Sequence, residues 1–154
     1  MTKLKETDFI PVEEFELFWR WADEGHNILP DNILQLIHPL SLTKSAEYHQ
    51  KSLLFLPSMK AGKYFDCEIG DEQTKEWLLS LGLIDSTQIV ISWAEKICVV
   101  TTIEVFIQYW DDFCYPSSDQ ALIWSEDNDW VLFYDDNNSF TLSTKTAHLT
   151  TRSS

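Results

Sequence analysis

The last third of the chain alternates apolar runs with short polar segments, and this pattern predicts an antiparallel β-sheet. Two β-branched runs, 88–93 and 97–100, flank a short turn at 94–96 and are typical of a β-hairpin. Three further apolar runs follow, separated by polar turns: 120–125, 130–135 and 139–143. Because sequential strands joined by tight turns pair antiparallel, we predict that these three strands form a meander.

Between the hairpin and the meander, apolar residues recur at the three- and four-residue spacing of a helix. This spacing predicts one helix that is capped by Thr101 or Thr102 and ends near Phe113. The side chains expected to face inward are Ile103, Phe106, Trp110 and Phe113. The side chains expected to face water are Glu104, Gln108, Asp111 and Asp112.

The first quarter of the chain also has helical spacing. We predict a helix from Pro11 to Gly25, because proline suits a first helical turn and glycine suits a helix end. Its expected inward side chains are Phe15, Phe18, Trp19 and Ala22. Arg20 falls on the opposite side, and Trp21 falls near the edge of the apolar stripe, where partial exposure is expected.

Shorter signals fill the middle of the chain. Three helices are predicted, at about 32–38, 42–51 and 71–81. The apolar run 53–57 is assigned to a buried strand, with helix as the competing interpretation, and 58–62 to a loop before an extended segment at 64–68. The predicted fold class is α+β: one domain over 1–154, with a helical N-terminal half packed on a C-terminal antiparallel β-meander that has one inserted helix. Residues of about 145–154 are expected to fray.

Composition and charge narrow the functional classes. The chain has 154 residues, and 44% of them are hydrophobic, which favours a folded domain despite a net charge of −14. This charge disfavours nucleic acid and anionic membrane as partners, because their phosphates would be repelled. We find neither a signal peptide nor a membrane-spanning apolar run, and Cys67, Cys98 and Cys114 have no CxxC spacing. A soluble cytoplasmic protein with free thiols is therefore expected.

No motif in the chain points to catalysis, to a metal or to a cofactor. The four histidines lack metal-ligand spacing, and the acidic segment 126–129 lacks the glycine and the distant glutamate of a calcium-binding loop. Cys114 lies beside acidic residues, which would raise rather than lower the pKa of a thiol. We therefore assign no catalytic residue, metal ligand or cofactor.

The candidate binding residues lie in an acidic stretch. Between Lys96 and Lys145 there is no Lys or Arg, whereas this segment carries nine Asp and Glu. Carboxylates beside amphipathic rings suit recognition of arginine and lysine, so we expect a basic protein as the partner. The candidate residues are Tyr109, Asp111, Asp112, Tyr115, Asp119, Asp135 and Asp136. Since surface carboxylates contribute little to stability and the net charge is strongly negative, reversal of Asp111 and Asp112 to lysine is expected to leave thermal stability roughly unchanged or slightly higher.

Three alternatives stay open at this point. The Asp111-Asp112 pair can instead be a solvated helix face that ends in a turn. A small-molecule or enzymatic site can be formed by an aromatic pocket near Tyr109, Trp124 and Trp130. The acidic residues can also mimic the charge of DNA, which requires a regular two-row spacing. The oligomeric state is not indicated by the sequence.

Two segments resemble known families. The segments YWDDFCYPSSDQALIW (109–124) and DWVLFYDD (129–136) resemble an uncharacterised family of small γ-proteobacterial proteins. That family has no established activity, so the resemblance implies no catalytic residues. The strand around Trp130 and Tyr134, followed by an acidic turn, is similar to immunity proteins of bacterial toxin systems, which are small, acidic and cytoplasmic. This likeness implies a toxin as the basic partner, although 135–138 is Asp-Asp-Asn-Asn where such proteins often carry His and Glu.

Overall fold

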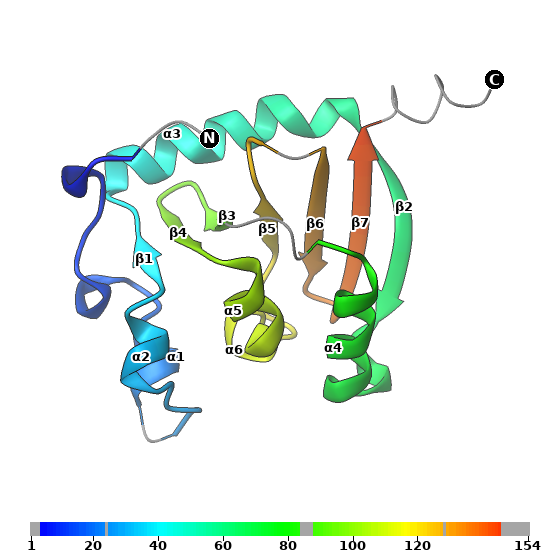
Figure 1. Cartoon of the computed structure of the whole chain (residues 1–154), viewed down its shortest axis with the longest axis horizontal. Coiled ribbons are helices and arrows are strands. Elements are labelled where there is room, and N and C mark those ends of the chain that lie inside the picture. The colour runs from blue at the N-terminus through cyan, green and yellow to red at the C-terminus, as the bar shows by residue number, and fades with distance from the viewer. Residues whose placement is uncertain (1–3, 24, 84–87, 128, 146–154) are drawn as a thin grey trace.

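A computed structural model describes residues 4–23, 25–83, 88–127 and 129–145. Within these ranges, seven strands form one antiparallel sheet in the order β1-β4-β3-β5-β6-β7-β2 (Figure 1). The strands are β1 His38–Pro39, β2 Met59–Asp66, β3 Ile89–Ala94, β4 Ile97–Thr101, β5 Ala121–Trp124, β6 Trp130–Asp135 and β7 Ser139–Lys145. The predicted α+β class is confirmed, and so are the β3–β4 hairpin and the β5–β6–β7 meander.

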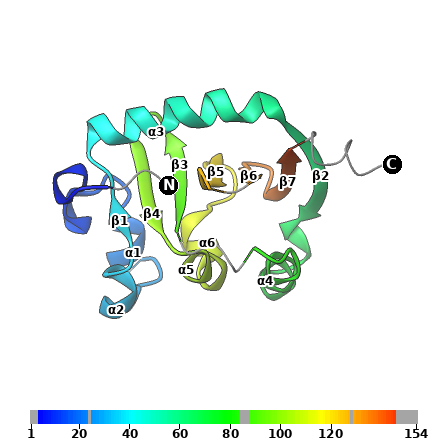
Figure 2. The same ribbon diagram turned by 45° about the horizontal axis from the view of Figure 1, so that its top comes forward.

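Both faces of the sheet are covered. Helix α3, Leu42–Phe55, crosses one face, and the other face carries a group of short helices (Figure 2). These helices are α1 Trp19–Ala22, α2 Asp31–Leu34, α4 Asp71–Ser80, α5 Ile103–Gln108 and α6 Trp110–Phe113. The described residues also form short 3-10 turns: Glu6–Asp8, Val12–Glu14, Leu56–Ser58 and Cys67–Ile69. Helices therefore form a layer on each side of the sheet.

The register of the sheet explains why its strands are apolar at nearly every position. Ile91, Ile123 and Leu132 are paired across β3, β5 and β6 and pack against the short helices. Their neighbours in sequence, Val90 and Trp124 among them, point to the opposite face and pack against α3. A strand that is buried on both faces loses the alternation of apolar and polar residues.

The segment 53–57, which the sequence assigned to a strand, belongs instead to the end of α3 and the following 3-10 turn. The sheet-facing side chains of α3 are spaced as in a helix: Ser45, Tyr48, Ser52 and Phe55. Leu53 and Leu54 are exposed, which makes the run look like a strand in sequence although only part of it is buried. The competing helical interpretation is therefore the right one.

Strand β2 begins at Met59, in the segment that was predicted to be a loop. It pairs with β7 at the edge of the sheet, and most of its side chains are exposed. A bulge lies between Ala61 and Lys63, around Gly62. An exposed, bulged edge strand carries no hydrophobic alternation, so its sequence gives little indication of a strand.

The predicted helix 11–25 and the predicted helix up to Phe113 are both interrupted. The first consists of a 3-10 turn, Val12–Glu14, and then α1. Arg20 and Trp21 are buried and Trp19 is 40% exposed, which is the reverse of the prediction.

The predicted helix that ends near Phe113 breaks at Tyr109, whose φ of −118° and ψ of 30° are not helical. Trp110 and Phe113 still face inward as predicted, but the break also turns Asp112 inward.

Candidate functional site

Asp119 forms an ion pair inside the protein rather than facing a partner. Its Oδ2 lies 2.7 Å from Nη1 of Arg20, and both side chains are less than a tenth exposed. The same oxygen accepts a hydrogen bond from the backbone N–H of Tyr115 at 2.9 Å, and the Arg20 guanidinium lies 4.0 Å from the centre of the Tyr115 ring. The ring-and-carboxylate arrangement expected for an arginine is therefore present at Tyr115 and Asp119, but it holds the chain's own Arg20.

Asp112 is likewise part of the interior. Only 5% of its surface is exposed, and its carboxylate accepts a hydrogen bond from the Asn27 side chain at 3.0 Å. Its backbone carbonyl accepts one from the indole N–H of Trp21, also at 3.0 Å. Burial raises the pKa of Asp112. The expectation that Asp112 faces water is wrong, and its reversal to lysine would place a second positive charge in the interior close to Trp21.

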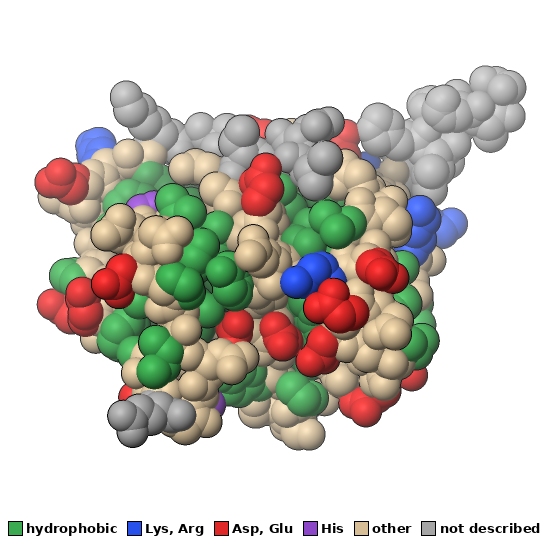
Figure 3. Space-filling view, turned by 60° about the horizontal axis from the view of Figure 1, so that its bottom comes forward, with side chains coloured by type: hydrophobic (Ala, Val, Ile, Leu, Met, Phe, Trp, Pro, Cys, Tyr) green, Lys and Arg blue, Asp and Glu red, His purple; other side chains and the backbone are tan. Residues whose placement is uncertain are grey.

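Asp111 and Tyr109 lie on a different surface, which we call the acidic groove. It is a hollow of about 410 Å³ between α4, α6 and the loop before α2. Its polar lining consists of Asn27, Asp71, Glu72, Lys75, Gln108, Tyr109, Asp111 and Asp112. Figure 3 shows carboxylates gathered on this face, with a basic side chain among them and hydrophobic surface nearby. Lys75 is the cationic residue among the described residues that line the groove.

The groove exists because α4 and α6 are fixed beside each other. Gly70, with a φ of 154°, precedes α4 and allows the sharp turn out of the Cys67–Ile69 segment. Asp71 and Glu72 then form the first turn of α4, where the helix dipole favours carboxylates. The indole N–H of Trp110 donates to the Asp71 carbonyl at 3.3 Å, which places the start of α4 next to Asp111.

A second hollow, which we call the apolar extension, adjoins the acidic groove. It has a volume of about 340 Å³ and is lined by Lys75, Leu79, Glu104, Ile107 and Gln108. Lys75 and Gln108 line both hollows, so the two are neighbours along α4 and α5. Leu79 is 53% exposed here. The combined surface has several carboxylates at one end, and at the other end it has Leu79 and Ile107 beside Glu104.

The electrostatics of the groove are dominated by the partial burial of Asp111, to which a neighbouring carboxylate adds. Burial, and after it the nearby charge of Asp71, raises the pKa of Asp111 above that of an ordinary aspartate. Lys75 acts in the opposite direction, but it does not cancel these effects. A raised pKa means that the surroundings disfavour the charged form of the carboxylate, although the carboxylate is still charged at neutral pH. A cation that enters the groove would relieve this cost.

Asp135 and Asp136 are not part of this surface. They lie in the turn between β6 and β7, where the Asp135 carboxylate accepts hydrogen bonds from the Gln120 side chain at 3.2 Å and from the Asp136 backbone N–H at 2.8 Å. Asp136 is exposed. Neither residue lines the acidic groove, so the groove contains only Tyr109, Asp111 and Asp112 of the seven candidates, while Tyr115 and Asp119 meet around Arg20.

The sequence did not indicate that Asp71, Glu72 and Asn27 belong to the same site. Asp71 and Glu72 carry the ordinary signature of a helix start, and Asp111 follows them by about forty positions. Only the packing of α4 against α5 and α6 brings these carboxylates together. The excess of acidic residues was visible in the sequence, but their partners within one groove were not.

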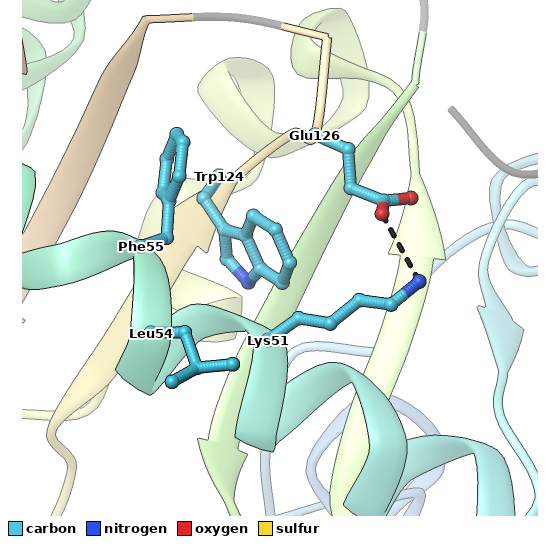
Figure 4. A pocket seen from close by; sticks show the side chains of 5 residues that line it. All are labelled: Lys51, Leu54, Phe55, Trp124 and Glu126. Carbon is cyan, nitrogen blue, oxygen red and sulfur yellow. Dashed lines mark hydrogen bonds and ion pairs between the residues drawn. The ribbon is translucent and has the colours of Figure 1, made fainter.

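The aromatic pocket that the sequence raised as an alternative does not form. Tyr109 lines the acidic groove, whereas Trp124 lies on the opposite face of the sheet, beneath α3. Trp130 is buried among the residues that pack against the short helices. Trp124 instead lines a separate hollow beside α3 (Figure 4).

The three cysteines are buried thiols and are not activated as nucleophiles. Cys67, Cys98 and Cys114 are buried and free, and burial raises the pKa of each thiol, to about 11 for Cys67. No cluster of three or more His, Cys, Asp and Glu residues that could hold a metal occurs in the described ranges. Nor is any helix in those ranges long and apolar enough to cross a membrane.

Comparison with models of known protein families, with curated proteins and with solved structures finds no match for this chain.

The raised pKa of Asp111 predicts a stabilising substitution. Its native-state pKa lies above its unfolded value, so the charged form costs stability at pH values above the native-state pKa, and this cost disappears as the pH falls through it. Asp111→Asn should therefore raise the free energy of unfolding by roughly 0.5–1 kcal/mol at about pH 7. Urea denaturation should show no such gain at about pH 3.

The matched control for this prediction is Asp136→Asn, which removes the same charge from the exposed turn between β6 and β7. This control tests whether removing any one negative charge from a chain with a net charge of −14 raises the free energy of unfolding by the same amount. Equal gains for the two variants would mean that the crowding of carboxylates in the groove has no energetic effect of its own.

Proposed function

We propose that this chain is a non-enzymatic, cytoplasmic binding protein whose partner is a basic protein, held through the acidic groove in the manner of an immunity protein and its toxin. The observation that carries the proposal is the crowding of Asp71, Glu72 and Asp111 around one hollow, with Lys75 as the cation among the described lining residues. The raised pKa of Asp111 supports it, because such a carboxylate gains most from an added positive charge.

The shape of the surface favours a particular kind of segment on the partner. The acidic groove suits an arginine or lysine, since a cation in a partly enclosed site interacts more strongly with carboxylates than it does in bulk water. The apolar extension beside Leu79 and Ile107 suits an aliphatic or aromatic side chain close to that cation. We therefore propose that the bound segment carries a basic residue and an apolar residue side by side.

A cluster of three rings includes the residue that comes before Asn27 of the groove. Trp19 is 40% exposed, and its ring lies 4.9 Å from that of His26, which in turn stacks on Tyr115 at 6.1 Å. His26 precedes Asn27, a lining residue of the groove. Exposed, ordered rings beside a charged hollow are typical of the residues that contribute most to protein–protein binding.

Site-specific photo-crosslinking tests the location of binding. A photoreactive phenylalanine analogue at Gln108, which lines both hollows, should form an adduct with a basic protein in the native cell. The adduct should decrease between about 50 mM and about 500 mM added salt, because salt screens the attraction between charges.

The matched control carries the same photoreactive analogue at Gln50. Gln50 is also an exposed glutamine on a helix, but α3 lies on the opposite face of the sheet. An adduct with the same protein from both positions would contradict binding at the groove. An adduct from Gln108 that is unaffected by salt, or whose captured protein is acidic, would contradict the proposed chemistry of the partner.

A further inference from the structure

A separate hollow lies on the α3 face of the sheet. Its volume is about 370 Å³, and its lining residues are Lys51, Leu54, Phe55, Trp124 and Glu126. Figure 4 shows these side chains: three come from α3, Trp124 comes from the end of β5, and Glu126 comes from the turn that follows. A volume of this size falls within the range of small-molecule sites. The acidic groove lies across the sheet, so the two surfaces are distinct.

The indole N–H of Trp124 makes this hollow unusual. Trp124 is 1% exposed, and its Nε1 has no hydrogen-bond partner among the described residues. By contrast, the indoles of Trp21 and Trp93 donate to backbone carbonyls at 3.0 Å and 2.9 Å. A buried donor without an acceptor costs stability, and native proteins rarely keep one without a reason.

A second unpartnered polar atom lies in the same apolar cluster. The Tyr48 hydroxyl is also buried and has no hydrogen-bond partner among the described residues. Its ring centre lies 6.1 Å from that of Trp124, and both rings belong to the cluster between α3 and the sheet. Of these two groups, only the Trp124 N–H belongs to a residue that lines the hollow, so it is the donor that a bound molecule could satisfy.

We propose that the hollow binds a small, planar, uncharged molecule that carries an acceptor oxygen, such as a carbonyl or amide, for the Trp124 N–H. The Phe55 ring centre lies 5.8 Å from that of Trp124, at an interplanar angle of 38°, so the two rings contact each other and form one aromatic wall, which favours a flat ligand. The charge at the rim is already paired, because Lys51 Nζ lies 3.0 Å from Glu126 and 3.6 Å from Glu47. An anionic ligand would meet these carboxylates, which favours an uncharged one.

The indole nitrogen faces α3. Figure 4 shows the nitrogen edge of Trp124 turned toward the part of α3 that carries Leu54 and Phe55. Trp124 is 1% exposed, whereas Leu54 is 82% exposed, so Leu54 alone does not cover the N–H. A shift of the α3 side chains that line the hollow is therefore the movement that would let a ligand oxygen reach the N–H.

Indole N–H signals in a ¹⁵N-tryptophan NMR spectrum test this site, with benzamide as the probe. Benzamide is planar and uncharged and carries a carbonyl acceptor. Titration should shift the Trp124 N–H signal in a saturable way and leave the signals of Trp21 and Trp93 in place. Trp124→Phe, which keeps an aromatic ring but removes the donor, should weaken benzamide binding about three- to tenfold. Ethylbenzene, which has no acceptor, should bind both forms equally.

Leu54→Arg provides a second variant in case Trp124→Phe does not fold. Its position is exposed, so the fold should tolerate it, and the longer side chain, which can lie across the hollow, should reduce the shift of the Trp124 signal. The proposal is overturned if benzamide does not move the Trp124 signal up to its solubility limit. It is also overturned if the Trp21 and Trp93 signals move as much, or if ethylbenzene discriminates between the two forms as benzamide does.

Discussion

Asp119→Ala should lower the free energy of unfolding by about 3–5 kcal/mol, because it leaves Arg20 charged and unpaired inside the protein. Arg20 is 3% exposed, and its Nη1 depends on Asp119 at 2.7 Å and on the Phe113 carbonyl at 3.4 Å. The substitution also removes the acceptor for the Tyr115 backbone N–H. Chemical denaturation of the purified variant measures the loss directly.

A double variant separates the lost ion pair from lost packing. Arg20→Met with Asp119→Leu removes both charges and replaces them with apolar side chains, and a buried ion pair replaced in this way often costs little. The double variant should therefore be clearly more stable than Asp119→Ala alone. If Asp119→Ala loses less than about 1 kcal/mol, the ion pair does not hold α1 against the segment before β5.

The sequence predicted the sheet well because its signals are local. The hairpin and the meander depend on apolar runs of strand length and on the polar turns between them, and each of these can be recognised within about ten residues. The inward face of the segment 103–113 was also predicted, since a helical break of one residue at Tyr109 preserves the direction of Trp110 and Phe113.

The site was harder to predict because carboxylates look alike in a sequence. Asp111, Asp112 and Asp119 all lie in the same acidic stretch, yet Asp119 pairs with Arg20, about a hundred positions earlier, and Asp112 with Asn27. Arg20 itself was expected to face water, so no local signal could assign it a buried partner. A tertiary contact distinguishes a buried, structural carboxylate from one that faces a groove. The local spacing of residues in the sequence does not predict contacts between distant segments.

These contacts change which residues should be altered to test binding. Asp112 should not be substituted in a binding test, because it is buried against Asn27 and Trp21 and its loss would disturb the fold. Glu72→Lys with Asp111→Lys reverses two groove charges instead. The Glu72 side chain is 79% exposed, and the raised pKa of Asp111 means that its negative charge lowers the stability of the fold at neutral pH. A lysine in the first turn of α4 costs about 0.3–1 kcal/mol, which offsets the relief at Asp111, so stability should change little.

Binding should respond far more strongly than stability. Reversal of two carboxylates at the centre of the groove should slow association with the basic partner by at least about tenfold and weaken affinity by roughly a hundredfold. The matched control is Glu13→Lys with Glu14→Lys, which makes the same change in net charge at two exposed residues outside the groove. Surface plasmon resonance, with the partner that photo-crosslinking identifies, compares the two double variants at low and at high salt. If both double variants lose affinity equally, net charge rather than the groove governs the interaction. If neither does, the acidic residues serve solubility alone.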